Sequence, residues 1–240
     1  MGYFHFDPNA PFIRLFGAEH LAILAIIAAV CVVLVITASR LGTTGYRRLE
    51  WGVVGLIALT QASAQIGLAL NHAYTVADLP LHICNLAVFL SLIYAIKPFK
   101  YVGEFLYCLC MPGALFALLF PGWVGLPQTS FFSLNAFVMH TMLFCYPLTL
   151  LASKKLRPNF RRLPLCLLIL VIAAVPIYFF NQRFHSNFFF LYYAPAGSPL
   201  DFFRTYWGTP GYIFGYFPLI AAVWAVLYTP WALAGRKRKT

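Results

Sequence analysis

Seven long runs of apolar residues constrain the fold of this chain more than any other feature of its sequence. They cover residues 16–38, 51–73, 80–96, 102–120, 131–152, 163–180 and 210–233. A helix needs about 20 apolar residues to cross a bilayer, with about 17 as the lower limit. Backbone polar groups must be satisfied inside lipid, so helices are the form that such runs take. The sequence therefore predicts an all-α, polytopic membrane protein with seven transmembrane helices in a single domain over residues 1–240.

The composition supports this interpretation and excludes other classes of protein. Hydrophobic residues make up 62% of the chain and charged residues 10%, whereas a soluble domain has about 45–50% and about 25%. A soluble enzyme, a disordered protein and a disulfide-rich secreted module are therefore excluded. A membrane β-barrel is also excluded, because its strands alternate apolar and polar residues and the runs here are unbroken.

Basic residues are sorted between the two sides of the predicted bundle. Of the 17 lysines and arginines, 14 follow the first, third or fifth run or lie in the C-terminal tail: Arg40, Arg47, Arg48, Lys97, Lys100, Lys154, Lys155, Arg157, Arg161, Arg162, Arg236, Lys237, Arg238 and Lys239. By the positive-inside rule, the N-terminus is outside and the C-terminus is cytoplasmic, which agrees with an odd number of helices. We attribute the net charge of +11 to this topology and expect no nucleic-acid partner.

Two further segments have a predicted place relative to the membrane. The first run is too long for the apolar core of a signal peptide and lacks a basic segment before it, so we expect an uncleaved first helix. Residues 181–209 form a long outer linker rich in Phe and Tyr. Aromatic residues favour the membrane interface, so we expect this linker to lie on the outer leaflet or dip into it.

Polar side chains within the apolar runs gather in the predicted outer half. Ionisable residues in spanning helices are costly and are candidates for function. At about 1.5 Å per residue, the outer half receives Glu19, His20, Gln65, Asn71, His72, His82, Cys84, Asn135 and His140. The inner half has almost nothing comparable, so the sequence predicts a polar cavity that opens toward the outer face.

Cys84 is the one cysteine of six that shares this outer half, and we expect a free thiol. Asp78 is placed to cap the third helix and Pro80 suits its first turn. In a regular helix His82 would lie about 200° around the axis from Cys84. Either the helix start is irregular, or a base for the thiol comes from another helix, with His140 and His72 as the leading donors.

Other interpretations of the same residues remain open. Histidines can bind zinc, which would make the protein a zinc-dependent intramembrane hydrolase, but no two of them are spaced i, i+4 on one face. We therefore expect no metal, and without a glycine-rich phosphate loop no nucleotide cofactor. A transporter or a lipid-binding or small-molecule-binding protein would use the polar pocket without chemistry, and a structural protein would use the polar residues to join helices.

The stretch Leu79-Pro80-Leu81-His82-Ile83-Cys84 resembles the LPLHxC motif of the YwaF-like bacterial integral membrane proteins, which are related to animal transmembrane protein 164. Other parts of the chain are similar to that family as well. These are His20 in the first run, His140 in the fifth, and the segment Asn187-Phe188-Phe189-Phe190-Leu191 followed by Pro195. Phe188 and Phe189 stand where the family has Tyr and Met.

This resemblance implies acyl transfer between membrane phospholipids through an acyl-cysteine, in a bacterial cytoplasmic (inner) membrane. Cys84 would be the nucleophile, His140 the base and His82 a further catalytic residue. The expected substrate-binding residues are His20, Gln65, Asn71, His72, Asn135 and Asn187. The sequence does not specify an oligomeric state.

Overall fold

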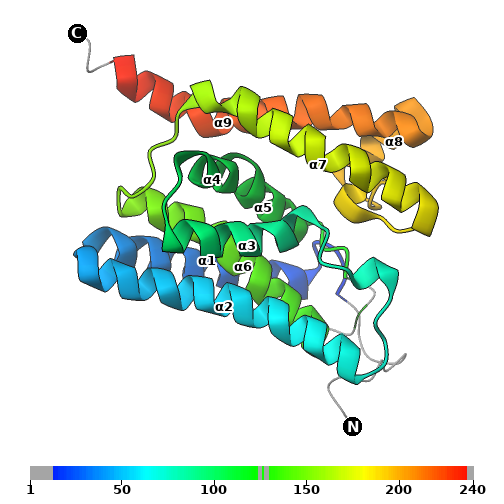
Figure 1. Cartoon of the computed structure of the whole chain (residues 1–240), viewed down its shortest axis with the longest axis horizontal. Helices are drawn as coiled ribbons and strands as arrows, with labels where there is room; N and C mark the ends of the chain where they lie inside the picture. Colours follow the sequence, from blue (N-terminus) through cyan, green and yellow to red (C-terminus); the bar gives the residue numbers. More distant parts are fainter. Residues whose placement is uncertain (1–12, 124–125, 127–129, 237–240) are drawn as a thin grey trace.

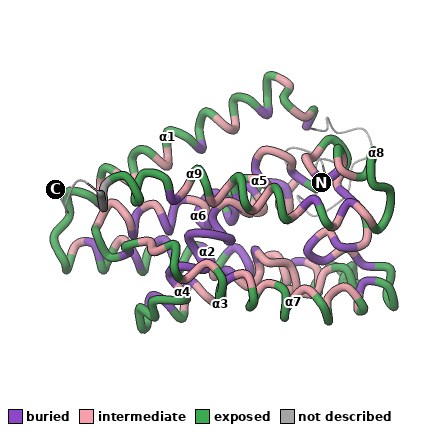
Figure 2. Tube along the Cα trace, turned by 90° about the horizontal axis from the view of Figure 1, so that it is seen from above, coloured by how far each residue is buried: buried purple, intermediate pink, exposed green. Residues whose placement is uncertain are grey.

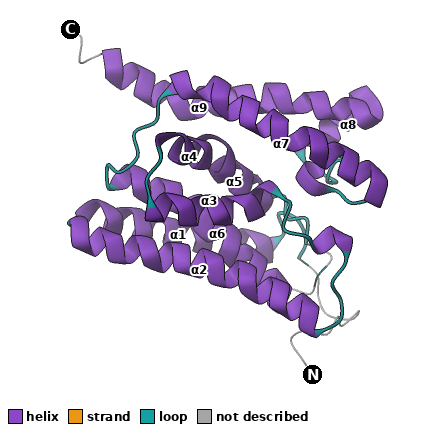
Figure 3. Ribbon diagram, in the orientation of Figure 1, coloured by secondary structure: helices purple, strands orange, loops and turns teal. Residues whose placement is uncertain are grey.

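The computed structural model describes residues 13–123, 126 and 130–236 of the chain, with side chains up to residue 233. Helices and loops make up this part, and no strand occurs within it (Figure 3). Seven helical segments in the described ranges are long and apolar enough to cross a membrane. The predicted fold class is therefore confirmed. Lys237, Arg238 and Lys239 lie outside the described residues.

The helices of the described part follow one another with short joins. They are α1 (Ala18–Arg40), α2 (Thr43–Leu70), α3 (Ile83–Ile96), α4 (Lys100–Phe105), α5 (Met111–Leu119), α6 (Phe131–Ala152), α7 (Leu163–Phe184), α8 (Pro199–Gly211) and α9 (Tyr216–Arg236). Short 3-10 turns are η1 (Val76–Asp78), η3 (Phe160–Arg162), η4 (Phe188–Phe190) and η5 (Tyr212–Gly215). The π-helical segment η2 (Leu106–Cys110) joins α4 to α5.

Successive spans run in opposite directions, so the segments between them gather at two ends of the bundle (Figure 1). One end holds residues 41–42, 97–99 and 153–162, and we call it the basic end. The other holds residues 71–82 and 185–198, and we call it the histidine end. The described basic residues that the sequence assigns to the cytoplasm thus share one end of the molecule.

The most buried part of the bundle is formed by α6 and by the fourth span, from α4 to α5. Helix α6 packs against α1, α2 and α5, and its Tyr146 and Leu150 are fully buried. By contrast, α7 and α9 present many exposed positions (Figure 2). Large apolar side chains such as Ile172 and Val226 are exposed there. This distribution is typical of a bundle whose outer helices face lipid.

Several predicted boundaries differ from the structure, since α3 begins at Ile83 and not at residue 80, α9 begins at Tyr216 and not at residue 210, and two further differences are larger. The second helix begins at Thr43, although the apolar run begins at residue 51, because helical structure extends through polar residues that hydropathy does not register. The predicted linker 181–209 is helical at both ends, since α7 continues to Phe184 and α8 begins at Pro199. The start of α8 has a local cause, because the Ser198 side chain accepts a hydrogen bond from the Asp201 amide and a proline follows it.

The fourth span is interrupted by its own sequence and is tied to α9 at that point. Pro112 has no N–H, so the carbonyl of Cys108, four residues earlier, lacks its helical donor. The Trp224 indole donates to that carbonyl at 3.0 Å. A proline in the fourth span thus creates an acceptor that positions the last helix.

Candidate functional site

The chain around His82 is not a regular helix. Asp78 accepts hydrogen bonds from the backbone and side chain of Thr75, at 2.8 and 2.6 Å, and so closes the turn η1 instead of capping α3. His82 is the N-cap residue of α3, with extended dihedral angles (φ −67°, ψ 153°). His82 thus lies just before the helix, so the offset of about 200° expected within a regular helix does not apply to it.

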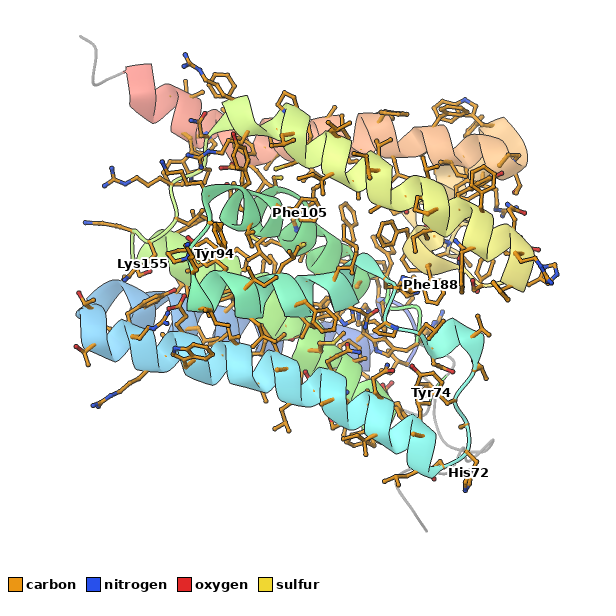
Figure 4. All side chains as sticks on the ribbon, viewed as in Figure 1. His72, Tyr74, Tyr94, Phe105, Lys155 and Phe188 are labelled. Carbon is orange, nitrogen blue, oxygen red and sulfur yellow. The ribbon has the colours of Figure 1, made fainter. Side chains whose placement is uncertain are left out.

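The aromatic segment η4 lies against His82. The imidazole ring is 5.2 Å from the Phe188 ring and 5.3 Å from the Phe190 ring, measured between centroids. Phe188 and Phe189 are buried, and Figure 4 shows Phe188 at the histidine end beyond the start of α3. Residues about one hundred positions away in the sequence therefore cover the LPLHxC motif.

This aromatic segment is held in an unfavourable backbone conformation. Phe189 and Phe190 have φ values of 57° and 52°, a region that bulky residues rarely adopt. Hydroxyl groups hold their carbonyls, since Tyr216 donates to Phe189 at 2.7 Å and Tyr212 to Phe190 at 2.9 Å. Strain of this kind persists only where the surroundings fix it, and it is often found at functional sites.

Cys84 is the second residue of α3 and is buried. The first intrahelical bond at this end runs from the Leu86 amide to the His82 carbonyl, at 3.1 Å. The amide N–H groups of residues 83–85 precede it, so they have no acceptor within the helix. The thiol packs in the apolar core and lies near Cys110 of the fourth span. Among the described residues, it forms no hydrogen bond to a histidine.

His140 of α6 has one nitrogen engaged and one available. Its Nδ1 lies 2.7 Å from the Ala136 carbonyl. A carbonyl only accepts, so Nδ1 carries the proton and Nε2 of the neutral ring is an acceptor. Within the described residues Nε2 forms no hydrogen bond. His82 lies close enough for a charge on one ring to act on the other, so two histidines from different spans lie near each other, and His82 precedes Cys84 by two residues in the chain.

Two further polar atoms, one on a residue that contacts His140 and one on the same helix, have no hydrogen-bond partner among the described residues. They are Nε1 of Trp123 and Oγ of Ser133, and both are buried. The Trp123 ring stacks on His140 with centroids 4.8 Å apart and planes 27° from parallel. Ser133 lies seven residues before His140, on the same face of α6. Buried polar atoms are usually satisfied, so this pair marks a place where a ligand would complete the hydrogen bonding.

The structure gives His20 two hydrogen bonds that join α1 to α5. Its Nδ1 accepts from the Phe16 amide at 3.0 Å, so Nε2 carries the proton and donates to the Leu118 carbonyl at 2.9 Å. The side chain is fully buried. Both nitrogens are thus engaged with the backbone, and His20 is separate from the pair formed by His82 and His140.

Three of the predicted substrate-binding residues have amide side chains, and these side chains hold backbone segments in place. Gln65 bonds the Tyr74 hydroxyl and the Asp78 carbonyl, at 2.6 and 3.2 Å. Asn135 bonds Ser63 and the Thr60 carbonyl of α2, at 3.3 and 2.8 Å. Asn187 uses its amide on the backbone of residues 192–193. In each case the structure shows a role in positioning.

Asn71 and His72 lie at the exposed end of α2. Asn71 donates to the Gly67 carbonyl of its own helix at 2.7 Å. His72 is exposed with φ of 51° and projects from the tip of the histidine end (Figure 4). It is therefore not grouped with His82 and His140.

Trp123, Ser133 and Asn85 are polar residues near the site that were not among the predicted candidates, and Asn85 is paired with Gln61. Asn85, the residue after Cys84, donates to Gln61 of α2 at 2.7 Å, which fixes the first turn of α3 against α2. Gln61 and Asn85 are polar residues within apolar runs, so the sequence contained a signal for both of them. Nothing local in the sequence distinguishes Ser133 or Trp123.

Comparison with known proteins places the chain in a family. The model of the TMEM164 family matches residues 15–228, which is most of the chain. The protein belongs to the TMEM164 family. No curated protein and no solved structure matches the chain. The region shared with the TMEM164 family includes the LPLHxC stretch, His140 and the aromatic segment η4.

The basic end of this TMEM164 family member contains two buried carboxylates that the sequence analysis did not consider. Glu104 is fully buried and accepts from Arg162 at 2.9 Å, from the Asn159 amide at 3.0 Å and from the Tyr228 hydroxyl. Glu50 accepts from Arg47 at 2.9 Å and Tyr146 at 3.1 Å. The expectation that the inner half has almost nothing comparable to the outer polar residues therefore did not account for these two buried carboxylates.

A metal centre was the rival chemistry at the histidine end. Among the described residues, no three His, Cys, Asp or Glu side chains gather in a way that could hold a metal ion. The grouping that the described residues show there is His82 with His140.

Proposed function

We propose that this protein is a membrane-embedded acyltransferase that moves acyl chains between phospholipids through a thioester on Cys84. The observation that carries the proposal is that His140 lies near His82, two residues before Cys84 at the start of α3, with Nε2 of His140 left without a partner among the described residues. The resemblance of the LPLHxC stretch to a family that uses an acyl-cysteine supports the same chemistry.

In the first step, Nε2 of His140 takes the proton of the Cys84 thiol. The sulfur attacks the ester carbonyl of a phospholipid, so that a carbon–sulfur bond forms and the carbon–oxygen ester bond breaks. The leaving lysophospholipid oxygen takes the proton back from His140. This step leaves an acyl thioester on Cys84 and a neutral imidazole.

In the second step, the hydroxyl of another lysophospholipid gives its proton to His140 and attacks the thioester. The carbon–sulfur bond breaks, a new ester forms, and the Cys84 sulfur recovers a proton from His140. No cofactor takes part, because the two esters exchange one acyl chain without oxidation or reduction.

The first turn of α3 offers donors for the negative charge that develops on the carbonyl oxygen. The amides of residues 83–85 have no acceptor within the helix, and fixed donors of this kind stabilise a tetrahedral intermediate. The indole N–H of Trp123 and the hydroxyl of Ser133 are further donors that lack a partner in the described part of the chain. We assign these two to the binding of polar oxygens of the lipid.

Access to Cys84 requires movement, because the thiol is buried and η4 covers His82. The ester would approach from the leaflet at the histidine end when η4 shifts. With the orientation that the basic residues imply, this is the outer leaflet of a bacterial cytoplasmic membrane.

The test follows an isotope-labelled acyl chain from a phospholipid to a lysophospholipid in vesicles that contain the purified protein. Cys84→Ala is expected to lower the transfer rate at least a thousandfold, the order found when an enzyme loses its nucleophile. Cys110→Ala is the matched control, because it removes a buried thiol from the same core cluster. It should retain transfer, and thermal unfolding of both variants checks their folding.

Two results would contradict the proposal. One is undiminished transfer by a folded Cys84→Ala variant. The other is the absence of transfer by the wild-type protein while it carries labelled lipid across the bilayer, which would favour a transporter.

A further inference from the structure

The basic end contains a hollow that the proposed acyl transfer does not use. It has a volume of about 570 Å³ and lies beside the start of α2. Its lining residues are Thr43, Thr44, Arg47, Arg48, Trp51 and Lys155. Three of them are basic and none is acidic. Figure 4 shows Lys155 at the end of the molecule opposite Phe188, so this hollow is remote from the site around Cys84.

Much of the positive charge around the hollow is not neutralised by carboxylates. Arg47 turns one nitrogen inward, where Nη1 donates to Glu50 at 2.9 Å and to the Ala95 carbonyl at 2.5 Å. The ion pairs found among the described residues include neither Arg48 nor Lys155. Two cations that lack an acidic partner in the described part of the chain therefore line one hollow.

Aromatic rings lie against two of the basic side chains that line the hollow, Arg47 and Lys155. The Arg47 guanidinium lies over the Trp51 ring, 5.2 Å from its centroid, and the Lys155 ammonium lies 5.9 Å from the centroid of Tyr46. Cations placed over rings retain their charge and their outward N–H donors. Together with the hydroxyls of Thr43 and Thr44, the hollow presents hydrogen-bond donors and positive charge, which is the chemistry that binds a phosphate group.

The surroundings of the hollow favour a lipid over a soluble anion. Trp51 is 40% exposed and Leu41 is 38% exposed, although both are large and apolar. Leu41 lies in the join between α1 and α2, and Trp51 lies eight residues after the start of α2, where the apolar run of that span begins. Tryptophan is enriched where a helix leaves the hydrocarbon of a membrane, so acyl chains could extend along the apolar faces of α1 and α2 below a headgroup in the hollow.

We propose that this hollow binds the headgroup of an anionic phospholipid from the leaflet at the basic end. The phosphate lies among Arg48, Lys155 and the two threonine hydroxyls, while Arg47 and Trp51 form one wall. Basic pockets between transmembrane helices hold anionic headgroups in this way. The site is independent of acyl transfer, because a lipid held here has its ester groups at the wrong end of the bundle for Cys84.

The experiment measures lipid binding to the purified full-length protein by native mass spectrometry in detergent. Phosphatidylglycerol and phosphatidylcholine with the same acyl chains are compared, and inorganic phosphate is added as a competitor. The double variant R48Q/K155Q is compared with R157Q/R161Q, which removes the same charge from exposed positions at the same end that do not line the hollow.

The wild-type protein is expected to retain phosphatidylglycerol in preference to phosphatidylcholine. R48Q/K155Q should lose about 30-fold in affinity for phosphatidylglycerol, from roughly fivefold for each charge removed. R157Q/R161Q should stay within about twofold of the wild-type protein, because its charges do not line the hollow. If the double variant does not fold, R48Q and K155Q alone should each show the roughly fivefold loss.

Three results would overturn the proposal. Equal retention of the two lipids would show that negative charge is not recognised. Equal losses in both double variants would show a general effect of surface charge. Displacement of phosphatidylglycerol by millimolar inorganic phosphate would identify a site for a soluble anion instead.

Discussion

At the basic end, each buried carboxylate has both oxygens engaged, whereas at the histidine end several buried polar atoms have no partner among the described residues. Glu104 and Glu50 accept from arginines, tyrosines and a backbone amide. Trp123 Nε1 and Ser133 Oγ form no hydrogen bond. Both ends are polar, but within the described part of the chain the buried carboxylates of the basic end are fully hydrogen-bonded and Trp123 and Ser133 are not.

This difference separates polar residues that stabilise the fold from those that serve a reaction. An unsatisfied buried polar group costs about 1–3 kcal/mol, so a fold that keeps such groups has a reason other than stability. The satisfied network around Glu104 joins the fourth span to α7 and α9. We therefore assign the basic end to structure and lipid anchoring and the histidine end to chemistry.

The largest expected effect concerns the base at the histidine end. His140→Gln should lower acyl transfer by about 10²–10⁴-fold, the usual contribution of a general base, with little change in thermal stability. His185→Asn is a suitable control, because His185 is exposed at the same end and bonds only Tyr192 among the described residues. Equal rates for the two variants would remove His140 from the mechanism.

The next effect concerns stability at the basic end. Glu104→Ala leaves Arg162 without its partner, and breaking a buried ion pair costs about 3–5 kcal/mol. Asp201→Asn is the comparison, because its pair with the exposed Arg204 is screened by solvent and contributes little to stability. Thermal unfolding in detergent measures both. A Glu104→Ala midpoint no lower than that of Asp201→Asn would mean that the basic end does not stabilise the bundle.

A smaller effect distinguishes an unsatisfied hydroxyl from a satisfied one. Ser133→Ala removes a buried oxygen that bonds nothing among the described residues, so it should not lower stability, but it should reduce acyl transfer about tenfold, the value of one hydrogen bond to a substrate. Ser186→Ala removes a buried hydroxyl that donates to Asn181 at 2.9 Å and should destabilise by about 1 kcal/mol. The reverse pattern in unfolding measurements would contradict the comparison between the two ends.

The sequence was sufficient for the spans and for the motif around Cys84, because hydropathy is a local property. It was not sufficient for the contact of Phe188 and Phe190 with His82, because the packing of α7 and α9 brings η4 to that place. Glu50 and Glu104 were not predicted as buried residues because their position in the sequence suggests exposure. Each lies near basic residues at the edge of a span, and only the structure shows that they are buried and paired.

The candidate substrate residues show the same limit. His20, Gln65 and Asn135 were grouped by depth and Asn187 was taken from the resembling segment 187–191, but neither criterion says which atoms their side chains bond. In the structure their polar atoms are engaged by backbone and neighbouring side chains. Among the described residues, polar atoms without a hydrogen bond belong to Trp123, Ser133 and His140, of which the sequence indicated only the last.

The most direct test of the central claim is the mass of the peptide that contains Cys84 after the purified protein has been mixed with phospholipid. The account predicts an increase equal to one acyl chain on Cys84 and on no other cysteine, which hydroxylamine removes, as it does thioesters. It also predicts that adding a lysophospholipid removes this adduct, because the acceptor takes the acyl chain. Acyl transfer that proceeds while the Cys84 peptide stays unmodified would contradict it.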